Sequence, residues 1–250
     1  MTPSLHRLDP PSAKLRGGDL TLPSMRETLT SRELWMGNAL QSEMDLLEPN
    51  ELVLEYTRLM MGFVLFQPKA QSIAMIGLGG GSLAKYCLRA VPSATIRVAE
   101  IDSRVIALRR RFKVPDDQPG FSVLEDDGAQ YVRVPPKRFD VILADAFNAA
   151  GPALSTTTQR FFDDCHRCLM PGGVLVVNVH LDRADTTLLV ERMCRGFSGN
   201  VVAVAEAYGH NAAVFARKGR GLGVAATDFG YAARVLGAVT AARLKKFFAA

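Results

Sequence analysis

The 250-residue chain is predicted to form an α/β fold, in which a mostly parallel seven-stranded sheet carries helices on both faces and a small β-region precedes it. Two observations predict this class. From residue 72 onward, short apolar runs alternate with segments of helical periodicity, as strands and crossover helices do in a parallel sheet. Glycines or acids also follow four of the apolar runs, which is typical of sheets that bind ligands at their strand ends.

Composition divides the chain into four segments. Residues 1–14 are rich in proline and polar residues and are expected to form a flexible arm. Residues 15–47 alternate short apolar and polar stretches, which predicts a small domain of two or three antiparallel strands that turn at 36–38. Residues 48–220 are predicted to form the domain of the large sheet, and residues 221–250 a single C-terminal helix with a basic end.

The large domain is predicted to open with a helix over 48–66, started by Pro49 and Asn50. Its apolar residues recur at steps of three and four: Leu52, Tyr56, Leu59, Met60 and Phe63. Five strand–helix units follow, with strands at 72–77, 95–102, 121–126, 139–147 and 173–179, and helices at 82–90, 103–112, from 128, 157–169 and 184–197. Residues 200–207 and 211–218 are predicted to close the sheet as a hairpin with one antiparallel strand.

Charge and composition exclude several classes of protein. The net charge is +5, but the basic residues are dispersed, and the one dense run, 109–111, is expected to be a solvated helix face, so no nucleic-acid partner is predicted. No apolar run approaches the roughly 18 residues that span a bilayer, and the first twenty residues lack the apolar core of a secretory signal. We therefore expect a cytoplasmic protein that does not bind membranes. Cys165 and Cys168 are spaced for one helix face and have no second ligand pair, so no metal is expected.

A glycine loop follows the first strand of the large sheet. It reads GLGGGS over residues 77–82, so a ligand can approach its backbone closely. The loop alone is a weak signal, because Ser82 stands where a dinucleotide-binding fingerprint has its third glycine. Glu100 follows Gly77 by 23 residues, close to the spacing of a ribose-binding acid in an NAD site. A dinucleotide therefore stays open at this point.

Two further acids favour a different cofactor. Asp127, in EDDG, follows the third strand, where a carboxylate can accept a hydrogen bond from an adenine amino group. Asp145, in LADAF, ends the fourth strand over the reactive part of a bound cofactor. Each acid alone could simply cap the following helix. Together with the glycine loop and Glu100, they fit a sulfonium nucleoside better than hydride transfer.

These motifs resemble those of the spermidine synthase family of aminopropyltransferases, which has the Rossmann-like fold of class I S-adenosylmethionine methyltransferases. The resemblance covers about residues 33 to 217 and rests on the segments GNALQSEMD, YTRLMMG, IGLGGGSLAKYCLR, VAEID, EDDGAQYV, FDVILADAFNAAGPA and FFDDCHRCLMPGGVLVVNV. It implies decarboxylated S-adenosylmethionine as the donor, a polyamine such as putrescine as the acceptor, and a homodimer or homotetramer.

The resemblance also implies roles for single residues. The glycine loop would shape the donor pocket, Glu100 would hold the ribose hydroxyls, Asp127 would meet the adenine amino group, and a glutamine would lie near the donor. The implied donor-binding residues are Gln41, Gly77, Gly79, Gly81, Glu100 and Asp127. On the acceptor side, Asp145 matches the acid that deprotonates the attacking amine, and Tyr56 matches a tyrosine that lines the site and assists it.

The chain also departs from the family pattern. Gly80 stands where the donor loop usually has an aspartate, Asn148 replaces a second acid three residues after Asp145, and Arg58 replaces a glutamate. Loss of a carboxylate that makes a charge-assisted hydrogen bond to the acceptor would cost about 1.5–3 kcal/mol. Glu43 and Asp45 are the candidates to replace the lost charges.

Three hypotheses remain from the sequence. The first is an aminopropyltransferase with an altered acceptor pocket, in which Asp145 is the general base. The second is a methyltransferase that uses ordinary S-adenosylmethionine, because Gly80 removes a partner of the donor's aminopropyl amine. The third is a catalytically impaired nucleotide-binding homologue.

Overall fold

The computed structural model describes residues 22–148, 151–225 and 229–249, so the expected arm at 1–14 lies outside the described residues. Seven strands form one sheet, in the order β11-β12-β10-β7-β4-β5-β6. They are β4 (Ser72–Ile76), β5 (Thr95–Glu100), β6 (Phe121–Glu125), β7 (Phe139–Ala144), β10 (Leu169–His180), β11 (Val201–Ala205) and β12 (Asn211–Arg217). The pairs from β10 to β6 are parallel, and β12 runs antiparallel to both of its neighbours, as the hairpin prediction required.

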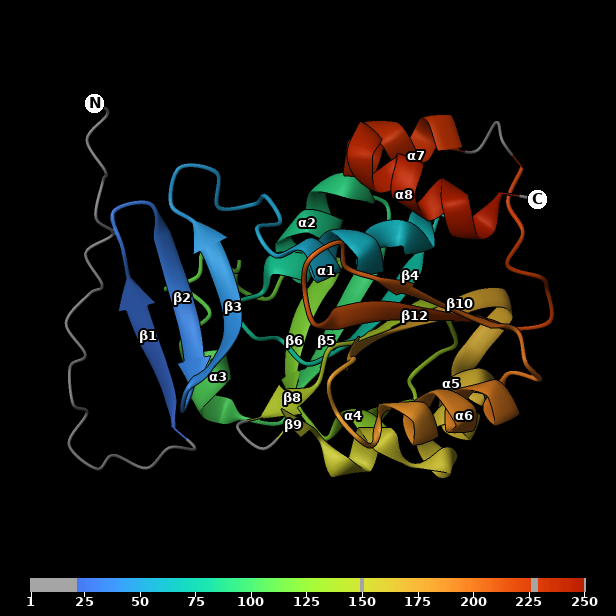
Figure 1. Cartoon of the computed structure of the whole chain (residues 1–250). Helices are drawn as coiled ribbons and strands as arrows, with labels where there is room; N and C mark the ends of the chain where they lie inside the picture. Colours follow the sequence, from blue (N-terminus) through green and yellow to red (C-terminus); the bar gives the residue numbers. More distant parts are fainter. Residues whose placement is uncertain (1–21, 149–150, 226–228, 250) are drawn as a thin grey trace.

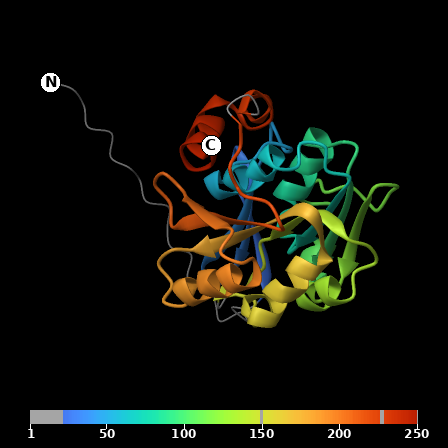
Figure 2. The same ribbon diagram turned by 90° about the vertical axis from the view of Figure 1, so that its right-hand side faces the viewer.

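Helices cover both faces of this sheet, as Figures 1 and 2 show. One layer holds α1 (Glu55–Met60), α2 (Ser82–Ala90), α3 (Ser103–Ala107), α7 (Phe229–Leu236) and α8 (Ala238–Phe248), and the other holds α4 (Gly128–Arg133), α5 (Gln159–Cys168) and α6 (Thr186–Gly196). Each layer buries its own apolar cluster against the sheet, because strands that are covered on both faces carry apolar side chains on both. The predicted α/β architecture is confirmed.

A separate three-stranded antiparallel sheet precedes the large one and consists of β1 (Pro23–Glu27), β2 (Ser31–Met36) and β3 (Ala39–Asp45). The turn between β2 and β3 lies where the sequence predicts it, and Gly37 adopts the left-handed conformation there (φ 60°). Leu34, Met36 and Met44 are buried in the same apolar cluster as α1 and α2. This small sheet is therefore packed onto the large domain.

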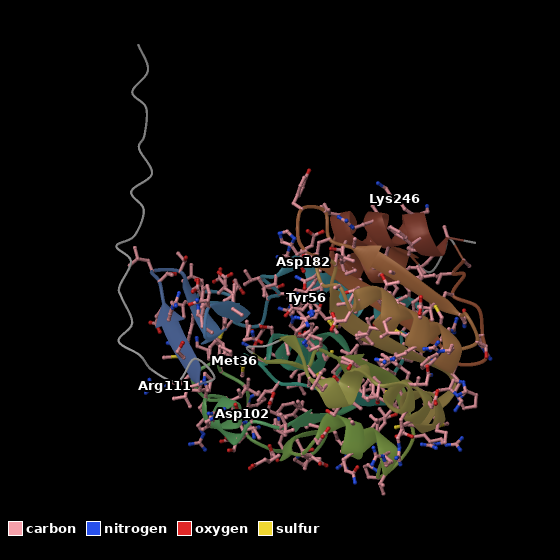
Figure 3. The ribbon with its side chains drawn as sticks, turned by 60° about the horizontal axis from the view of Figure 1, so that its bottom comes forward. Met36, Tyr56, Asp102, Arg111, Asp182 and Lys246 are labelled. Carbon is pink, nitrogen blue, oxygen red and sulfur yellow. The ribbon has the colours of Figure 1, made fainter. Side chains whose placement is uncertain are left out.

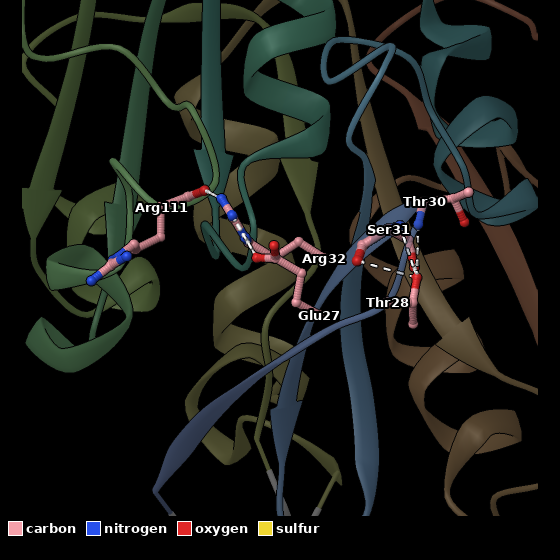
Figure 4. A network of polar contacts seen from close by, with 6 residues as sticks. All are labelled: Glu27, Thr28, Thr30, Ser31, Arg32 and Arg111. Carbon is pink, nitrogen blue, oxygen red and sulfur yellow. Dashed lines mark hydrogen bonds and ion pairs between the residues drawn. The ribbon is translucent and has the colours of Figure 1, made fainter. Parts of the chain in front are cut away.

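Polar contacts also join the small sheet to the large domain, and Figure 4 shows those around Arg32. Arg32 of β2 donates from Nε to Glu27 Oε2 at 2.8 Å and from Nη1 to the backbone carbonyl of Arg111, which follows α3. The hydroxyls of Ser42 in β3 and Ser82 in α2 lie 3.3 Å apart. The Arg32 contact ties β2 to the segment after α3, and the serine pair places β3 beside the start of α2.

Several helix boundaries differ from the sequence-based expectation. The helix predicted over 48–66 begins only at Glu55 and tightens into the 3₁₀ turn η1 (Met61–Leu65). The helix predicted over 103–112 ends at Ala107, so the arginine run lies in the turns beyond it. There, Arg109 pairs with Asp117 at 2.7 Å and Arg110 with Asp116 at 2.9 Å.

Two further differences concern the end of the fourth strand and the C-terminus. The segment after β7 contains a small hairpin, β8 (Phe147–Asn148) and β9 (Gly151–Pro152), followed by the 3₁₀ turn η2 (Leu154–Thr157). The single C-terminal helix predicted within 221–250 is wrong: it is two helices, α7 and α8. Gly237 separates them at φ 80°, a backbone conformation that cannot continue an α-helix.

Candidate active site

A cavity of about 850 Å³ lies at the carboxyl ends of the parallel strands, between the small sheet and the large one. In a doubly wound sheet, ligands bind where the strand order reverses, which here is the crevice between β4 and β7. Seven of the eight predicted site residues line this cavity: Gln41, Tyr56, Gly77, Gly79, Glu100, Asp127 and Asp145. Tyr56 and Asp182, two of the lining residues, are labelled in Figure 3.

The glycine loop leaves β4 with its backbone close to the neighbouring strand. Gly77 has φ 92°, and a Cβ there would lie 2.2 Å from the backbone carbonyl oxygen of Asp145. Gly79 also lies in the left-handed region, at φ 52°. Gly81 does not line the cavity: it precedes α2 at φ 68°, and a Cβ there would collide with Val114. The first two glycines can therefore meet a ligand, whereas Gly81 packs the start of α2.

Gly80 is covered by the small sheet. An ideal Cβ at this position would lie 2.6 Å from Ser42 Oγ and 3.0 Å from Phe112. Ser42 itself is 6% exposed and lines the cavity. The space next to Gly80 is thus filled by Ser42 from β3, and an aspartate would not fit there without moving it.

Glu100 holds the glycine loop by its carboxylate. Oε2 accepts a hydrogen bond from the backbone N–H of Leu78 at 2.7 Å, and Oε1 accepts one from Asp102 at 2.9 Å. The side chain is 8% exposed, and burial raises its pKa while these N–H groups act in the opposite direction. These two hydrogen bonds use two of the roughly four acceptor positions of the carboxylate, so capacity remains for hydroxyl donors.

Asp127 lies at the N-terminus of α4. Its Oδ1 accepts the backbone N–H of Ala129 at 2.8 Å and faces the Ser155 hydroxyl at 3.3 Å. Asp127 therefore caps α4, which is the structural role that the sequence allowed for each of these acids. The residue lines the cavity as well, so capping and ligand contact are compatible here.

Asp145 receives hydrogen bonds from two directions. The hydroxyl of Tyr56 in α1 donates to Oδ2 at 3.1 Å, and Asn178 Nδ2 in β10 donates to Oδ1 at 2.9 Å. Burial raises the pKa of Asp145 above its ordinary value, although both donors act against this shift. Burial beside this carboxylate also raises the pKa of the Tyr56 hydroxyl, so Tyr56 stays protonated and donates.

The remaining charges of the cavity are mostly negative. Its carboxylates belong to Glu100, Asp127, Asp145, Asp182 and Glu206, and its basic side chains are His180, Arg183 and His210. His180 stacks on Phe147 with ring centroids 4.4 Å apart. Arg183 pairs with Asp185 at 3.0 Å. A cavity of this charge in a protein of net charge +5 favours cationic ligands.

The structure reassigns three residues of the acceptor side. Glu43 and Asp45, the candidates to replace the missing acids, do not line the cavity, and Asp45 instead accepts the backbone N–H groups of Leu47 and Glu48. Arg58 does not line it either: its Nε donates to the carbonyl of Leu52 at 2.8 Å, in a separate hollow. Arg58 therefore does not face the cavity.

Sequence reasoning missed Glu206 as a lining residue. It follows β11, and because β12 is antiparallel to both β10 and β11, the carboxyl end of β11 reaches the same edge as the parallel strands. The rule that located Asp145 would have found Glu206 too, had the direction of β11 been considered.

The described residues contain neither a metal-binding cluster nor a membrane-spanning helix. In the ranges 22–148, 151–225 and 229–249, no three His, Cys, Asp or Glu side chains are grouped so that they could hold a metal ion. Within the same ranges, no helix has the length and apolar character needed to cross a membrane.

The chain is similar to known proteins in sequence and in fold. A polyamine aminopropyltransferase from Chromobacterium violaceum is 38% identical over 187 residues, which are 74% of this chain and 72% of the relative. A probable spermidine synthase from Corynebacterium glutamicum superposes with a TM-score of 0.72 at 24% identity, over 85% of this chain and 82% of that one. A spermidine synthase in complex with the transition state analogue AdoDATO superposes with a TM-score of 0.58 at 22% identity, over 78% and 73%.

The solved structures establish the fold, and the sequence relatives establish the family. The spermine/spermidine synthase domain matches residues 53–206, more than half of the chain. This range contains Tyr56, the glycine loop, Glu100, Asp127 and Asp145. The chain therefore belongs to the spermine/spermidine synthase family of transferases.

Proposed function

We propose that this protein transfers an aminopropyl group from decarboxylated S-adenosylmethionine to a diamine or polyamine. The single observation that carries the proposal is the position of Asp145. Its partly buried carboxylate lies at the switch point of the sheet, in one cavity with Glu100 and Asp127, and it is oriented by Tyr56 and Asn178. The relatives named as polyamine aminopropyltransferases support the same reaction.

The proposed reaction is a displacement at carbon. The acceptor ammonium first loses a proton to Asp145, whose raised pKa makes it a better base than an exposed aspartate. The freed amine lone pair attacks the aminopropyl carbon next to the sulfonium. As the new C–N bond forms, the C–S bond breaks, and its electron pair leaves with sulfur as neutral methylthioadenosine.

The donor would be held by the residues on the other side of the cavity. Glu100 would accept the ribose hydroxyls with the acceptor positions that Leu78 and Asp102 leave open, and Asp127 would accept the adenine amino group. Gln41 and the backbone at Gly77 and Gly79 would complete the donor pocket. No metal is part of the proposal.

The second candidate is methyl transfer from S-adenosylmethionine. Residue 80 is a glycine and Ser42 fills the space beside it, so no aspartate meets the donor's amine from this side. Discrimination against the carboxylate of the intact donor is therefore expected to weaken. Asp145 acts against this candidate, because its negative charge disfavours a second carboxylate nearby.

The experiment that tests the proposal offers the purified protein both donors. Decarboxylated and intact S-adenosylmethionine are supplied at equal concentration with a panel of amines that includes putrescine. Methylthioadenosine and S-adenosylhomocysteine are then quantified by mass spectrometry. Methylthioadenosine in excess supports aminopropyl transfer, S-adenosylhomocysteine in excess supports methyl transfer, and neither product would contradict both.

We also propose a homodimer or homotetramer. Apolar side chains are exposed on and around the small sheet, at Leu22, Met25, Leu29 and Leu47, with Leu29 at 99% and Leu47 at 83%. Such a concentration of exposed apolar surface is typical of an interface. Light scattering after size exclusion would give the mass of the particle, and a monomer at micromolar concentration would contradict the proposal.

A further inference from the structure

A second carboxylate in the cavity is held in the same way as Asp145. Asn178 Nδ2 donates to Asp145 Oδ1 at 2.9 Å, while Asn211 donates to Glu206 Oε2 from its backbone N–H at 3.1 Å and from Nδ2 at 3.3 Å. Tyr56 connects the two acids: its hydroxyl donates to Asp145 and its backbone N–H donates to Glu206 Oε1 at 2.8 Å. The two carboxylates are thus fixed at opposite ends of one tyrosine.

The segment that carries Glu206 is held from two helices. The carboxylate of Glu55 in α1 accepts the backbone N–H of Ala207 at 3.1 Å. Arg243 of α8 pairs with Glu55 at 3.0 Å and donates to the backbone carbonyl of Ala205. The residues on both sides of Glu206 are therefore fixed, although this segment connects two strands near the surface.

The glycine at 209 makes room for the acid. A Cβ at Gly209 would lie 1.7 Å from Glu206 Oε2 and 2.5 Å from its carboxyl carbon. Any side chain at this position would therefore push the Glu206 carboxylate out of its place. Glu206 can adopt this conformation only because residue 209 is a glycine and has no Cβ.

This arrangement leaves acceptor capacity facing the cavity. A carboxylate offers about four lone-pair positions, and Glu206 uses three of them on Tyr56 and Asn211. The amide oxygens of Asn178 and Asn211 accept no hydrogen bond from the described parts of the chain, because both amides turn their N–H₂ groups toward the carboxylates. A ligand that donates hydrogen bonds would satisfy these groups.

We infer that Glu206 binds the second, non-reacting ammonium of a diamine acceptor, whose reacting nitrogen lies at Asp145. The inference rests on the proposed function and names the substrate class that this site selects. The inference also names a replacement for the acids that the family pattern has and this chain lacks. Arg58 faces another hollow, and Glu43 and Asp45 lie outside the cavity. Glu206 supplies the missing negative charge from the turn after β11.

The test compares putrescine with n-butylamine, which has the same carbon chain and lacks the second amine. Methylthioadenosine release is measured for the wild-type protein, Glu206→Gln, Gly209→Ala and the control Glu191→Gln, which removes an exposed acid of α6 outside the cavity. Wild type is expected to have a KM for putrescine about tenfold or more below that for n-butylamine, as a charge-assisted hydrogen bond predicts.

Glu206→Gln is expected to remove most of this difference by raising the KM for putrescine alone, with kcat changed less than about threefold. Gly209→Ala is expected to act in the same direction without changing any charge, and Glu191→Gln is expected to match wild type. Thermal melts of all four proteins show whether each variant is folded.

Other outcomes separate the inference from the proposed function. If wild type releases no methylthioadenosine with either amine, the proposed function fails and the inference fails with it. If wild type is active but Glu206→Gln keeps the preference for putrescine, only the inference is wrong. If Glu206→Gln lowers kcat equally with both amines, Glu206 acts by positioning Tyr56, which also contradicts the inference.

Discussion

The environment of Asp145 combines two opposing influences on one carboxylate. Burial raises its pKa, and the donors Asn178 and Tyr56 limit that rise. A base needs this balance, because an acid with an ordinary pKa near 3.9 takes a proton from an ammonium poorly, whereas a neutral carboxyl group takes none. Tyr56 supplies its hydroxyl to one acid and its backbone N–H to another, so one residue organises both ends of the proposed acceptor site.

Asp145→Asn should separate activity from stability. We expect kcat/KM to fall by about 10²–10⁴ because the base is lost. Because its pKa is raised, the Asp145 carboxyl group binds a proton more readily in the folded protein than in the unfolded chain. The ionised carboxylate therefore lowers the free energy of unfolding at pH values above its folded pKa. This loss of stability disappears as the pH falls from the folded pKa toward the unfolded one. The variant should therefore unfold at higher urea than wild type at pH 7.5, with the gap closing toward pH 4. A gap that widens toward acid pH would contradict this environment.

Tyr56→Phe should move the pH profile without destroying the site. Removing the hydroxyl leaves Asp145 with one donor fewer, so its pKa rises further and the acid limb of kcat/KM moves to higher pH. At neutral pH we expect a loss of about five- to tenfold, the net worth of one hydrogen bond. Rates measured from pH 5 to 9 would show the shift, and an acid limb at the wild-type position would contradict it.

Among the elements, the glycine loop is the one that packs directly against the backbone of Asp145. It turns sharply after β4 because Gly77 and Gly79 adopt left-handed conformations, and the Gly77 turn brings the loop against the backbone of Asp145. Glu100 then fixes the loop through the backbone N–H of Leu78. The loop and the proposed base are thus parts of one packed unit.

Gly77→Ala tests this packing against a matched control. Gly77 and Gly120 have almost the same φ, 92° and 88°, but a Cβ at 77 would meet Asp145 at 2.2 Å whereas a Cβ at 120 meets nothing within 4 Å. Gly120→Ala should lower the free energy of unfolding by about 1–2 kcal/mol from backbone strain, and Gly77→Ala by about 2 kcal/mol more. Urea titrations would measure both, and equal losses would show that the close approach is unimportant.

Element types were largely predictable from the sequence, whereas several boundaries were not. The strands of the large sheet could be located because apolar runs and glycine or acidic ends are local signals. The start of α1 could not, because the backbone N–H of Tyr56 is satisfied by Glu206, 150 positions away, rather than by a local cap at Asn50. The break at Gly237 was missed because apolar periodicity continues across it.

The same distinction applies to the site. Residues at or just after the carboxyl ends of the parallel strands, such as Glu100, Asp127 and Asp145, follow one rule of topology and were predicted to lie in one cavity, which they do. Glu206 lies in the turn between β11 and β12, and the edge of the sheet that this turn reaches depends on how β12 pairs. No sequence pattern encodes the orientation of Arg58, which the structure turns away from the cavity. Their chemical roles remain predictions.

At the scale of the whole molecule, the C-terminal helices are part of the support for the site. Phe248 of α8 is 1% exposed, and its ring lies 5.1 Å from the rings of both Phe66 and Phe215. From the same helix, Arg243 contacts Glu55 and Ala205. The chain end is therefore joined to α1 and to the segment that carries Glu206 (Figure 1).

Phe248→Ala should destabilise the whole domain by about 3–5 kcal/mol, since it removes a fully buried ring. The control is its neighbour Phe247, which is 47% exposed, so Phe247→Ala should change the free energy of unfolding by less than about 1 kcal/mol. Urea unfolding followed by fluorescence and circular dichroism would give both values. Similar losses for the two variants would contradict the packing of α8.

The measurement that tests the central claim most directly is a comparison of wild type with Asp145→Asn, each given decarboxylated S-adenosylmethionine and putrescine. Methylthioadenosine and the aminopropylated amine are quantified together by mass spectrometry, and a melt confirms that the variant is folded. Our account predicts that wild type forms both products in equal amounts and that the folded variant is slower by about 10²–10⁴. A folded wild-type protein that forms neither product, or a variant that forms both at the wild-type rate, would contradict it.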